Sequence, residues 1–142
     1  LPKSGTVFIS VNDRDKEHIV PIARGYADLG FDIVATHGTA ILLKNAGIDV
    51  KEVLKVSEGR PNIVDMIKNN LISLIINTAA GKQTNDDTNV IRQAALQYGI
   101  AYTTTLTGAR ASARAIQHQQ NSTLRVECIQ DYYSASPKGE RA

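Results

Sequence analysis

The sequence predicts an α/β fold, in which an open, mainly parallel sheet carries helices on both faces. Two observations support this class. Short apolar runs rich in β-branched residues alternate with segments whose apolar residues recur at helical spacing, and short links join them. In addition, 142 residues with 42% apolar content suffice for one compact core. We therefore expect a single domain over residues 1–142, with an ordered core at about 5–131.

The expected strands are the short β-branched runs. The fourth of them, SLIIN, is the most apolar, which suits the centre of a parallel sheet that is covered on both faces. The last one, TLRVECIQ, follows a helical segment and is expected as a sixth strand. The strands are predicted at 6–11, 31–35, 52–56, 73–77, 100–104 and 123–130.

Helices are expected between successive strands, because each intervening segment combines helical spacing with a start or stop signal. Asn12 and Asp13 offer caps for the first helix, in which Pro21 predicts a kink or a late start. Gly47 ends the second helix, and Pro61 lies near the first turn of the third. The remaining helices are predicted at 88–99 and 106–119.

Composition excludes several classes of protein. The net charge of +2, with 21% charged residues, is not the basic footprint of a nucleic-acid-binding protein, so no DNA partner is expected. The single cysteine, Cys128, cannot form an internal disulfide, which suits a reducing cytoplasm. No apolar run approaches the roughly 20 residues that span a bilayer. The linker-like start LPKSG and the polar end SASPKGERA indicate a module of a longer chain.

Polar side chains follow the carboxyl end of each expected strand. In open parallel sheets these ends meet at one rim, where ligands bind against helix amino ends. Ammonium, hydroxyl and amide donors gathered there favour an anion, and phosphate is the commonest candidate. Gly38 would let the backbone approach it, and Asp87, an acceptor among donors, suits a ribose hydroxyl. We therefore predict a site for a phosphorylated sugar or nucleotide, formed by Lys16, Thr36, Thr39, Lys55, Asn77, Thr78, Lys82 and Asp87.

Each of these residues also has a purely structural interpretation. Thr36 and Thr39 are suitable caps for the helix that follows them, and Asp87 is a suitable cap for a later one. Surface lysines are usually solvated, and Asn77 fits a turn at the end of its strand. His37 lies in the same turn as the threonines, with no carboxylate partner nearby in sequence. The residues alone leave both interpretations open.

Motifs for other chemistry are absent from the sequence. Gly81-Lys82 is not a P-loop, because the glycine five positions earlier is missing and Gln follows the lysine. There is no Gly-x-Gly-x-x-Gly, and the three histidines lack the spacing of metal ligands. Cys128 is expected to be a buried hydrophobic residue. We therefore predict no catalytic residue and no metal ligand.

An ordered set of fragments resembles a known family. FDIVATHGTA, KVSEGRPNI, LIINTAAG and VIRQAALQYGIAYTTTL, with DKE after the first strand, are similar to the carboxyl-terminal regulatory domain of the large subunit of carbamoyl-phosphate synthetase. That domain has the methylglyoxal synthase-like fold. The likeness runs from about Gly5 to Asp131. It implies a three-layer, five-stranded, mainly parallel sheet with an added antiparallel edge strand, in a domain from the carboxyl end of a larger chain.

The resemblance also implies a ligand for the rim. Bacterial members of the family bind UMP as an inhibitor and IMP as an activator. Asp87 matches the family position near the ribose. The positions that hold the phosphate and nearby groups are matched by Lys16, Thr36, Thr39, Lys55 and Asn77.

A second ligand, ornithine, is implied beside the fifth strand. Tyr102 and Thr104 match family positions that line an ornithine site shared with the rest of the synthetase. Thr103 replaces the acidic residue expected between them, and Ala79 replaces a hydroxyl that relatives carry near the phosphate. Lys82 and Gln83 stand where relatives often have paired arginines.

The parent enzyme of this family makes carbamoyl phosphate from bicarbonate, ammonia and ATP with Mg or Mn, for arginine and pyrimidine synthesis. The implied partners are the rest of the large subunit and its glutaminase small subunit. Because the ATP-grasp machinery is absent from this chain, we expect a nucleotide-sensing domain without a cofactor of its own, in the cytoplasm. Two alternatives stay open: a ligand-free assembly module, and a phospho-sugar lyase of the methylglyoxal synthase type. In such a lyase the catalytic aspartate would fall near Arg60 and the histidine near Asp86.

Overall fold

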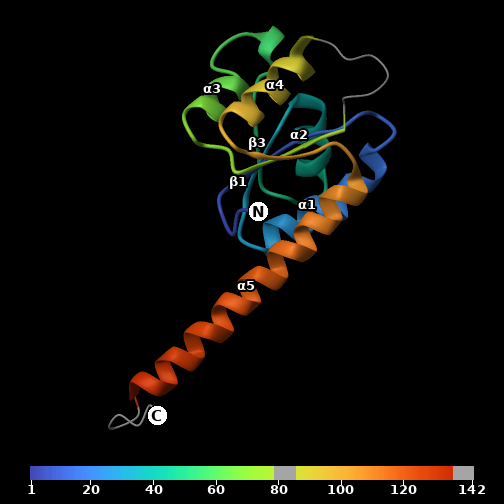
Figure 1. Cartoon of the computed structure of the whole chain (residues 1–142). Coiled ribbons are helices and arrows are strands. Elements are labelled where there is room, and N and C mark those ends of the chain that lie inside the picture. The colour runs from blue at the N-terminus through green and yellow to red at the C-terminus, as the bar shows by residue number, and fades with distance from the viewer. Residues whose placement is uncertain (79–85, 136–142) are drawn as a thin grey trace.

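The computed structural model describes residues 1–78 and 86–135, with all of their side chains except those of 57, 86, 87 and 123–135. A five-stranded sheet forms its centre, in the order β3-β2-β1-β4-β5 (Figure 1). All four strand pairs are parallel. The strands are β1 (Thr6–Ser10), β2 (Asp32–Ala35), β3 (Val50–Glu52), β4 (Leu74–Asn77) and β5 (Ala101–Thr103).

The strand order places a switch point in the middle of the sheet. β1 pairs with β2 on one side and with β4 on the other, so that Val7 is opposite both Ile33 and Leu74. The chain first adds β2 and β3 on one side and then returns to add β4 and β5 on the other. The carboxyl ends of β1 and β4 therefore flank the crevice in which sheets of this kind bind ligands.

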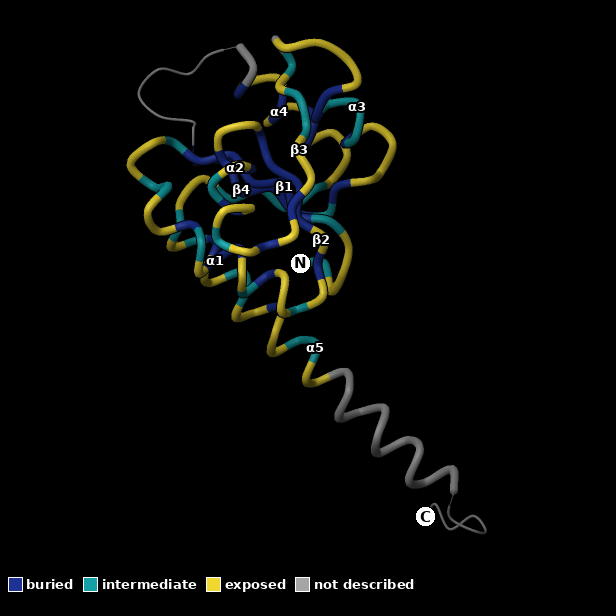
Figure 2. Tube along the Cα trace, turned by 180° about the vertical axis from the view of Figure 1, so that it is seen from behind, coloured by how far each residue is buried: buried dark blue, intermediate teal, exposed yellow. Residues whose placement is uncertain are grey.

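Helices cover both faces of the sheet, as predicted. α1 (Lys16–Asp28), α2 (His37–Asn45) and α5 (Leu106–Ala135) pack on the face to which Val7 and Ile9 point. α3 (Ile63–Lys68) and α4 (Asp86–Gln97) pack on the face to which Phe8 points. The alternation of side chains along β1 thus feeds two separate apolar layers. In Figure 2 the central strands are buried and the outer helix surfaces are exposed.

Tyr26 joins α1 to α5 inside the first of these layers. Its ring is fully buried and meets the ring of Phe31 edge to face, with 5.8 Å between the centroids. Its hydroxyl donates a 2.7 Å hydrogen bond to the carbonyl of Ala109. A buried phenol needs such an acceptor, so this bond fixes where α5 begins to lie along α1.

Two helix starts differ from the simplest expectation. Pro21 lies inside α1, five residues after its first residue, so the proline does not delay the helix. α3 begins at Ile63, after Pro61, and Asn62 caps it. The Asn62 Oδ1 atom accepts from the amide of Val64 at 2.9 Å, while Asp65 Oδ2 accepts from the amide of Asn62 at 2.8 Å. This reciprocal pair is a capping box.

The third strand is shorter and earlier than predicted. β3 ends at Glu52, and the chain then makes a single bridge at Leu54 before the short 3₁₀ helix η1 (Val56–Glu58). Apolar residues of the EVLKV run still face the second apolar layer, since Val53 and Val56 pack against it. The apolar residues of this run serve its half-buried position against the second layer, and most of the run is not in a strand.

The prediction of a sixth, antiparallel edge strand is wrong. Residues 123–130 continue α5, which runs without interruption for 30 residues and extends beyond the body of the domain (Figure 1). The segment from 109 to 135 contains neither glycine nor proline, so no residue in it stops the helix. Val126 and Ile129 do not outweigh the helix-forming Leu124, Arg125, Glu127 and Gln130 around them.

No helix in the described parts of the chain has the length and hydrophobicity to cross a membrane.

Candidate anion site at the carboxyl ends of β1, β2 and β4

The turn between β2 and α2 presents two buried hydroxyls to the end of β1. Thr36 precedes α2, but its side chain makes no capping hydrogen bond. Its Oγ1 donates instead to Ser10 Oγ at 3.4 Å. Thr39, which is 1% exposed, accepts a 3.5 Å hydrogen bond from the amide of Val11. These contacts argue against the interpretation of Thr36 as an ordinary cap, since its hydroxyl bonds to Ser10 and not to a first-turn amide of α2.

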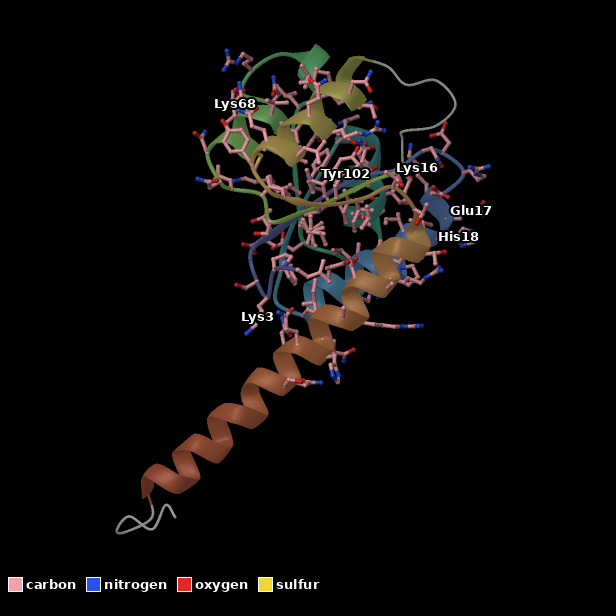
Figure 3. The ribbon with its side chains drawn as sticks, viewed as in Figure 1. Lys3, Lys16, Glu17, His18, Lys68 and Tyr102 are labelled. Atoms are coloured by element: carbon pink, nitrogen blue, oxygen red, sulfur yellow. The ribbon has the colours of Figure 1, made fainter. Side chains whose placement is uncertain are left out.

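Lys16 brings a positive charge to the same helix start. It is the first residue of α1, and a Cβ atom placed on Gly38 would lie 3.1 Å from its Nζ atom. The ammonium of Lys16, which is labelled in Figure 3, therefore lies beside the place that a Cβ atom at position 38 would take, closer than an ordinary van der Waals contact. Lys16 Nζ also contacts Asp13 Oδ1 at 2.8 Å, and this hydrogen bond and charge lower the pKa of Asp13. Asp13 is almost fully exposed, so an anion can compete with it for Lys16.

Asn77 and Thr78 place amide and hydroxyl groups at the end of β4. The backbone amide of Thr78 donates to the carbonyl of Ser10 at 3.0 Å, and Thr78 Oγ1 accepts from the amide of Asn12 at 3.2 Å. Asn77 lies opposite Ser10 in the sheet and is 2% exposed. Its Nδ2 atom is 3.1 Å from the hydroxyl of Tyr102, and its Oδ1 atom has no partner among the described residues.

Ser10 connects these groups and was not predicted. It contacts Thr36 through its side chain and Thr78 through its carbonyl, so it lies between the ends of β2 and β4. Its one signal in the sequence is that it is a polar residue within the apolar run TVFISV. Asn12, which holds Thr78 through its amide and its side chain, was expected only as a helix cap.

A pocket of about 320 Å³ extends the site toward the start of α5. It joins Thr78, from the predicted phosphate set, to Thr104, from the predicted ornithine side. Thr105 caps α5 by accepting from the amide of Gly108 at 3.0 Å. Arg14 and Asp15 bring both signs of charge to its wall, and neither was predicted. The lining residues are Asn12, Arg14, Asp15, Thr78, Thr104, Thr105, Leu106 and Thr107.

The other predicted residues are less closely tied to this cluster. Lys55 is exposed and precedes η1, and among the described residues its side chain makes no hydrogen bond or ion pair with Lys16 or Thr39. Asp87 lies in the first turn of α4, but its side chain is outside the described part of the structure. Lys82 lies outside the described residues altogether. The residues that the structure brings together are Lys16, Thr36, Thr39, Asn77 and Thr78, with Tyr102 and Thr104 beside them.

His37 has a carboxylate partner that its sequence neighbours do not reveal. Its Nδ1 atom is 3.0 Å from Glu52 Oε2, on the adjacent strand β3. Both side chains are substantially exposed, at 64% for His37 and 39% for Glu52. The imidazole is therefore directed along the rim, and it is not buried among the hydroxyls of Thr36 and Thr39.

Other features of the structure lie away from this cluster. A larger pocket of about 600 Å³ lies along β3 near Lys51, Met66 and Leu71, and none of its lining residues belongs to the predicted set. Within the described ranges, no three His, Cys, Asp or Glu side chains gather in a way that could hold a metal ion. The chemistry available at the carboxyl ends of β1, β2 and β4 is therefore that of one cation with hydroxyl and amide donors, which suits an oxyanion.

Comparison with known proteins agrees with this architecture. The family model described as the MGS-like domain matches residues 18–104, which include every predicted site residue except Lys16. The large chain of carbamoyl phosphate synthase from Nostoc is 48% identical over 132 residues, covering 93% of this chain and 12% of that protein. The carboxyl-terminal section of the same large chain from Methanopyrus kandleri is also 48% identical, covering 94% of this chain and 25% of that protein.

A solved structure shows the same fold at lower similarity. Methylglyoxal synthase from Elizabethkingia anophelis superposes with a TM-score of 0.64 at 18% identity, covering 80% of this chain and 79% of that one. This likeness supports the predicted fold. The chain spans only a small part of the length of the synthase large chains that it matches.

Proposed function

Because the chain belongs to the MGS-like domain family, we propose that it is the nucleotide-binding regulatory domain of a carbamoyl-phosphate synthase large chain. The proposal rests on one observation: cationic, hydroxyl and amide side chains lie together at the carboxyl ends of β1, β2 and β4. These residues are Lys16, Thr36, Thr39, Asn77 and Thr78. The names of the relatives support the parent enzyme, since they are large chains of carbamoyl phosphate synthase.

The proposed ligand is UMP or IMP, held chiefly by its phosphate. The amino end of α2 offers backbone amides that Thr36 does not cap, and the Lys16 ammonium lies against it. Hydrogen bonds to a charged group contribute about 1.5–3 kcal/mol each, so a few of them suffice for binding after the entropic costs are met. Lys55 and Lys82 are proposed as further phosphate contacts, and Asp87 as the acceptor for a ribose hydroxyl.

In this proposal the domain senses and does not catalyse. The carbamoyl phosphate made by the rest of the large chain and its glutaminase small subunit, with ATP and Mg or Mn, serves arginine and pyrimidine synthesis. Ornithine is the proposed ligand beside Tyr102 and Thr104. Of these two residues, Thr104 lines the pocket that also contains Arg14 and Asp15. Occupancy of the site controls that synthesis if the two docked states of the domain bind nucleotide with different affinity.

The contacts of Arg60 disfavour the lyase alternative. Arg60 Nη2 contacts Asp65 Oδ1 at 2.7 Å, and this pair raises the pKa of Arg60. A guanidinium ion cannot abstract a proton from a substrate at neutral pH. The nearby Asp65 is also a weak base, since its pKa is lowered by Arg60 and by the amide of Asn62. A lyase of this type would lack its catalytic carboxylate here.

Calorimetric titration with UMP, IMP and inorganic phosphate tests the proposal. We expect the wild-type chain to bind a nucleotide, and Lys16→Met to weaken that binding by about tenfold or more, because it removes a charge-assisted contact. Lys68→Met is the matched control, since Lys68 is exposed on α3, well away from Lys16 (Figure 3). Heats equal to those of buffer at millimolar ligand would favour the assembly module instead. Turnover of dihydroxyacetone phosphate would favour the lyase.

A further inference from the structure

Asn77 carries a buried side-chain amide at the end of β4, beside the candidate anion site. Asn77 is 2% exposed, and its Oδ1 atom has no hydrogen-bond partner among the described residues. Its Nδ2 atom donates to the hydroxyl of Tyr102 at 3.1 Å. Buried amide groups are nearly always hydrogen-bonded on both atoms. A free oxygen at the end of β4 therefore indicates that a bound molecule completes the hydrogen bonding of Asn77.

The hydroxyl of Tyr102 can pair with either atom of the Asn77 side-chain amide, so the amide can rotate and exchange the positions of Oδ1 and Nδ2. A tyrosine hydroxyl both donates and accepts, so it can accept from Nδ2 or donate to Oδ1 with the atoms in the same places. In one orientation the free group of Asn77 is an acceptor, and in the other it is a donor. An oxyanion at the ends of β1 and β4 can bind only the orientation in which Nδ2 is free.

We propose that Tyr102 is a positioning residue for the anion site, acting through the orientation of the Asn77 amide. The proposal rests on the function proposed above and adds a residue that does not itself touch the anion. When the anion is bound, Nδ2 faces it and the Tyr102 hydroxyl donates its proton to Oδ1. When the site is empty, the Tyr102 hydroxyl accepts from Nδ2.

Tyr102 lies two residues before a residue that lines the pocket of about 320 Å³. Tyr102 is on β5, which pairs with β4, and it is half-buried (Figure 3). The next residue, Thr103, is fixed because its Oγ1 donates to the carbonyl of Ile75 at 3.2 Å. Thr104 then lines the pocket with Arg14 and Thr107.

A double-mutant cycle with inorganic phosphate and the nucleotides as probes tests the proposal. We expect Tyr102→Phe to raise the phosphate dissociation constant about threefold. The hydroxyl is hydrogen-bonded in both states, so what the variant loses is the extra strength of its bond to Oδ1 when the bound anion polarises the amide. In an Asn77→Ala background the same substitution should have no further effect, because its intermediary is gone. Tyr98→Phe, at an exposed position after α4, is the control and should leave the affinity within about twofold of wild type.

The side-chain amide of Asn77, observed by NMR, gives a reading beyond affinity. We expect its two amide proton signals to shift on phosphate binding in the wild type, and to lie elsewhere in Tyr102→Phe before any ligand is added. Equal phosphate affinity in wild type and Tyr102→Phe, or additive effects of the two substitutions, would overturn the positioning role while leaving the proposed function intact. Failure of the wild type to bind any of the probes would overturn both.

Discussion

The ammonium of Lys16, at the start of α1, lies beside Gly38, at the start of α2. A Cβ atom on Gly38 would lie 3.1 Å from Lys16 Nζ and 3.8 Å from Lys16 Cε. Gly38 is the second residue of α2, and its backbone φ is not in the left-handed region. Glycine is therefore not required there by the backbone. What it provides is room for the ammonium of Lys16 beside the amides of α2.

Gly38→Ala should separate binding from stability. We expect phosphate affinity to fall by about threefold, because the new methyl would lie 3.1 Å from Lys16 Nζ and makes the ammonium shift by a few tenths of an ångström. The free energy of unfolding should stay the same or rise by up to about 1 kcal/mol, because alanine is the better helix former. Titration calorimetry and urea denaturation measure the two quantities.

Gly25→Ala is the matched control for this substitution. Gly25 is in α1, and a Cβ atom there would meet nothing within 4 Å. It should show the same gain in stability with unchanged phosphate affinity. A Gly38→Ala variant that binds phosphate as tightly as the wild type would contradict the placement of Lys16 in the site.

Asp13→Asn should strengthen anion binding. Asp13 contacts Lys16 Nζ at 2.8 Å and competes with any anion for the same ammonium. Exposed ion pairs contribute about 0–1 kcal/mol, so we expect phosphate affinity to rise by up to about fivefold. Asp28→Asn changes the net charge equally at the exposed far end of α1 and should have little effect. Equal gains in the two variants would mean that the change is one of overall charge alone.

Stability should fall in alkaline solution because of Tyr26. Burial raises the pKa of its hydroxyl to about 12, whereas in the unfolded chain it titrates near its ordinary value of about 10. Between these values the unfolded chain has lost the proton and the folded chain still holds it. The stabilisation is therefore complete below pH 10 and is lost as the pH rises toward 12, to a total of about 2 kcal/mol.

Tyr26→Phe isolates this contribution. At neutral pH we expect it to lower the free energy of unfolding by about 1 kcal/mol, because the bond to the carbonyl of Ala109 is lost. Between pH 9 and 11.5, urea denaturation should show a shallower decline in the variant than in the wild type. Parallel declines would show that Tyr26 does not account for the alkaline loss.

Asn62→Ala should destabilise the start of α3. Asn62 accepts from the amides of Val64 and Asp65 and is buried, so its removal leaves two first-turn amides without their partner. Loss of such a cap costs about 0.5–2 kcal/mol in the free energy of unfolding. Asn69→Ala, at the exposed other end of α3, should cost less than about 0.5 kcal/mol. Phosphate affinity should not change in either variant.

The sequence was sufficient for the sheet and for part of the site. Alternation of apolar runs with helical segments predicted six strands in a mainly parallel sheet. The first five are present, and the ends of parallel strands meet at one rim. That topology is why Thr36, Thr39, Asn77 and Thr78 could be predicted as neighbours although up to 42 positions separate them. Their side-chain partners Ser10 and Asn12 were not predicted as part of the site, because they are single polar residues without a distinctive motif.

Errors arose where local pattern and tertiary position disagree. His37 and Glu52 are 15 positions apart and meet only because β2 and β3 are adjacent. The run EVLKV is apolar because it packs on the second layer, and most of it is not strand. In TLRVECIQ two β-branched aliphatic residues suggested a strand, yet the helix before it meets no residue that would end it. Such choices depend on the surroundings of a segment.

Because α5 is long, a small tilt at its first turn produces a large displacement of its far end. A helix of 30 residues is about 45 Å long, so a tilt of about 5° at its first turn moves its far end by about 4 Å. That first turn lies beside the pocket of Thr104 and Thr107, and Tyr26 holds it at Ala109. α5 thus pivots next to the candidate anion site. A rotation too small to detect at the first turn of α5 would produce a measurable displacement at its carboxyl end, and spin labels or fluorescent dyes attached there can record it.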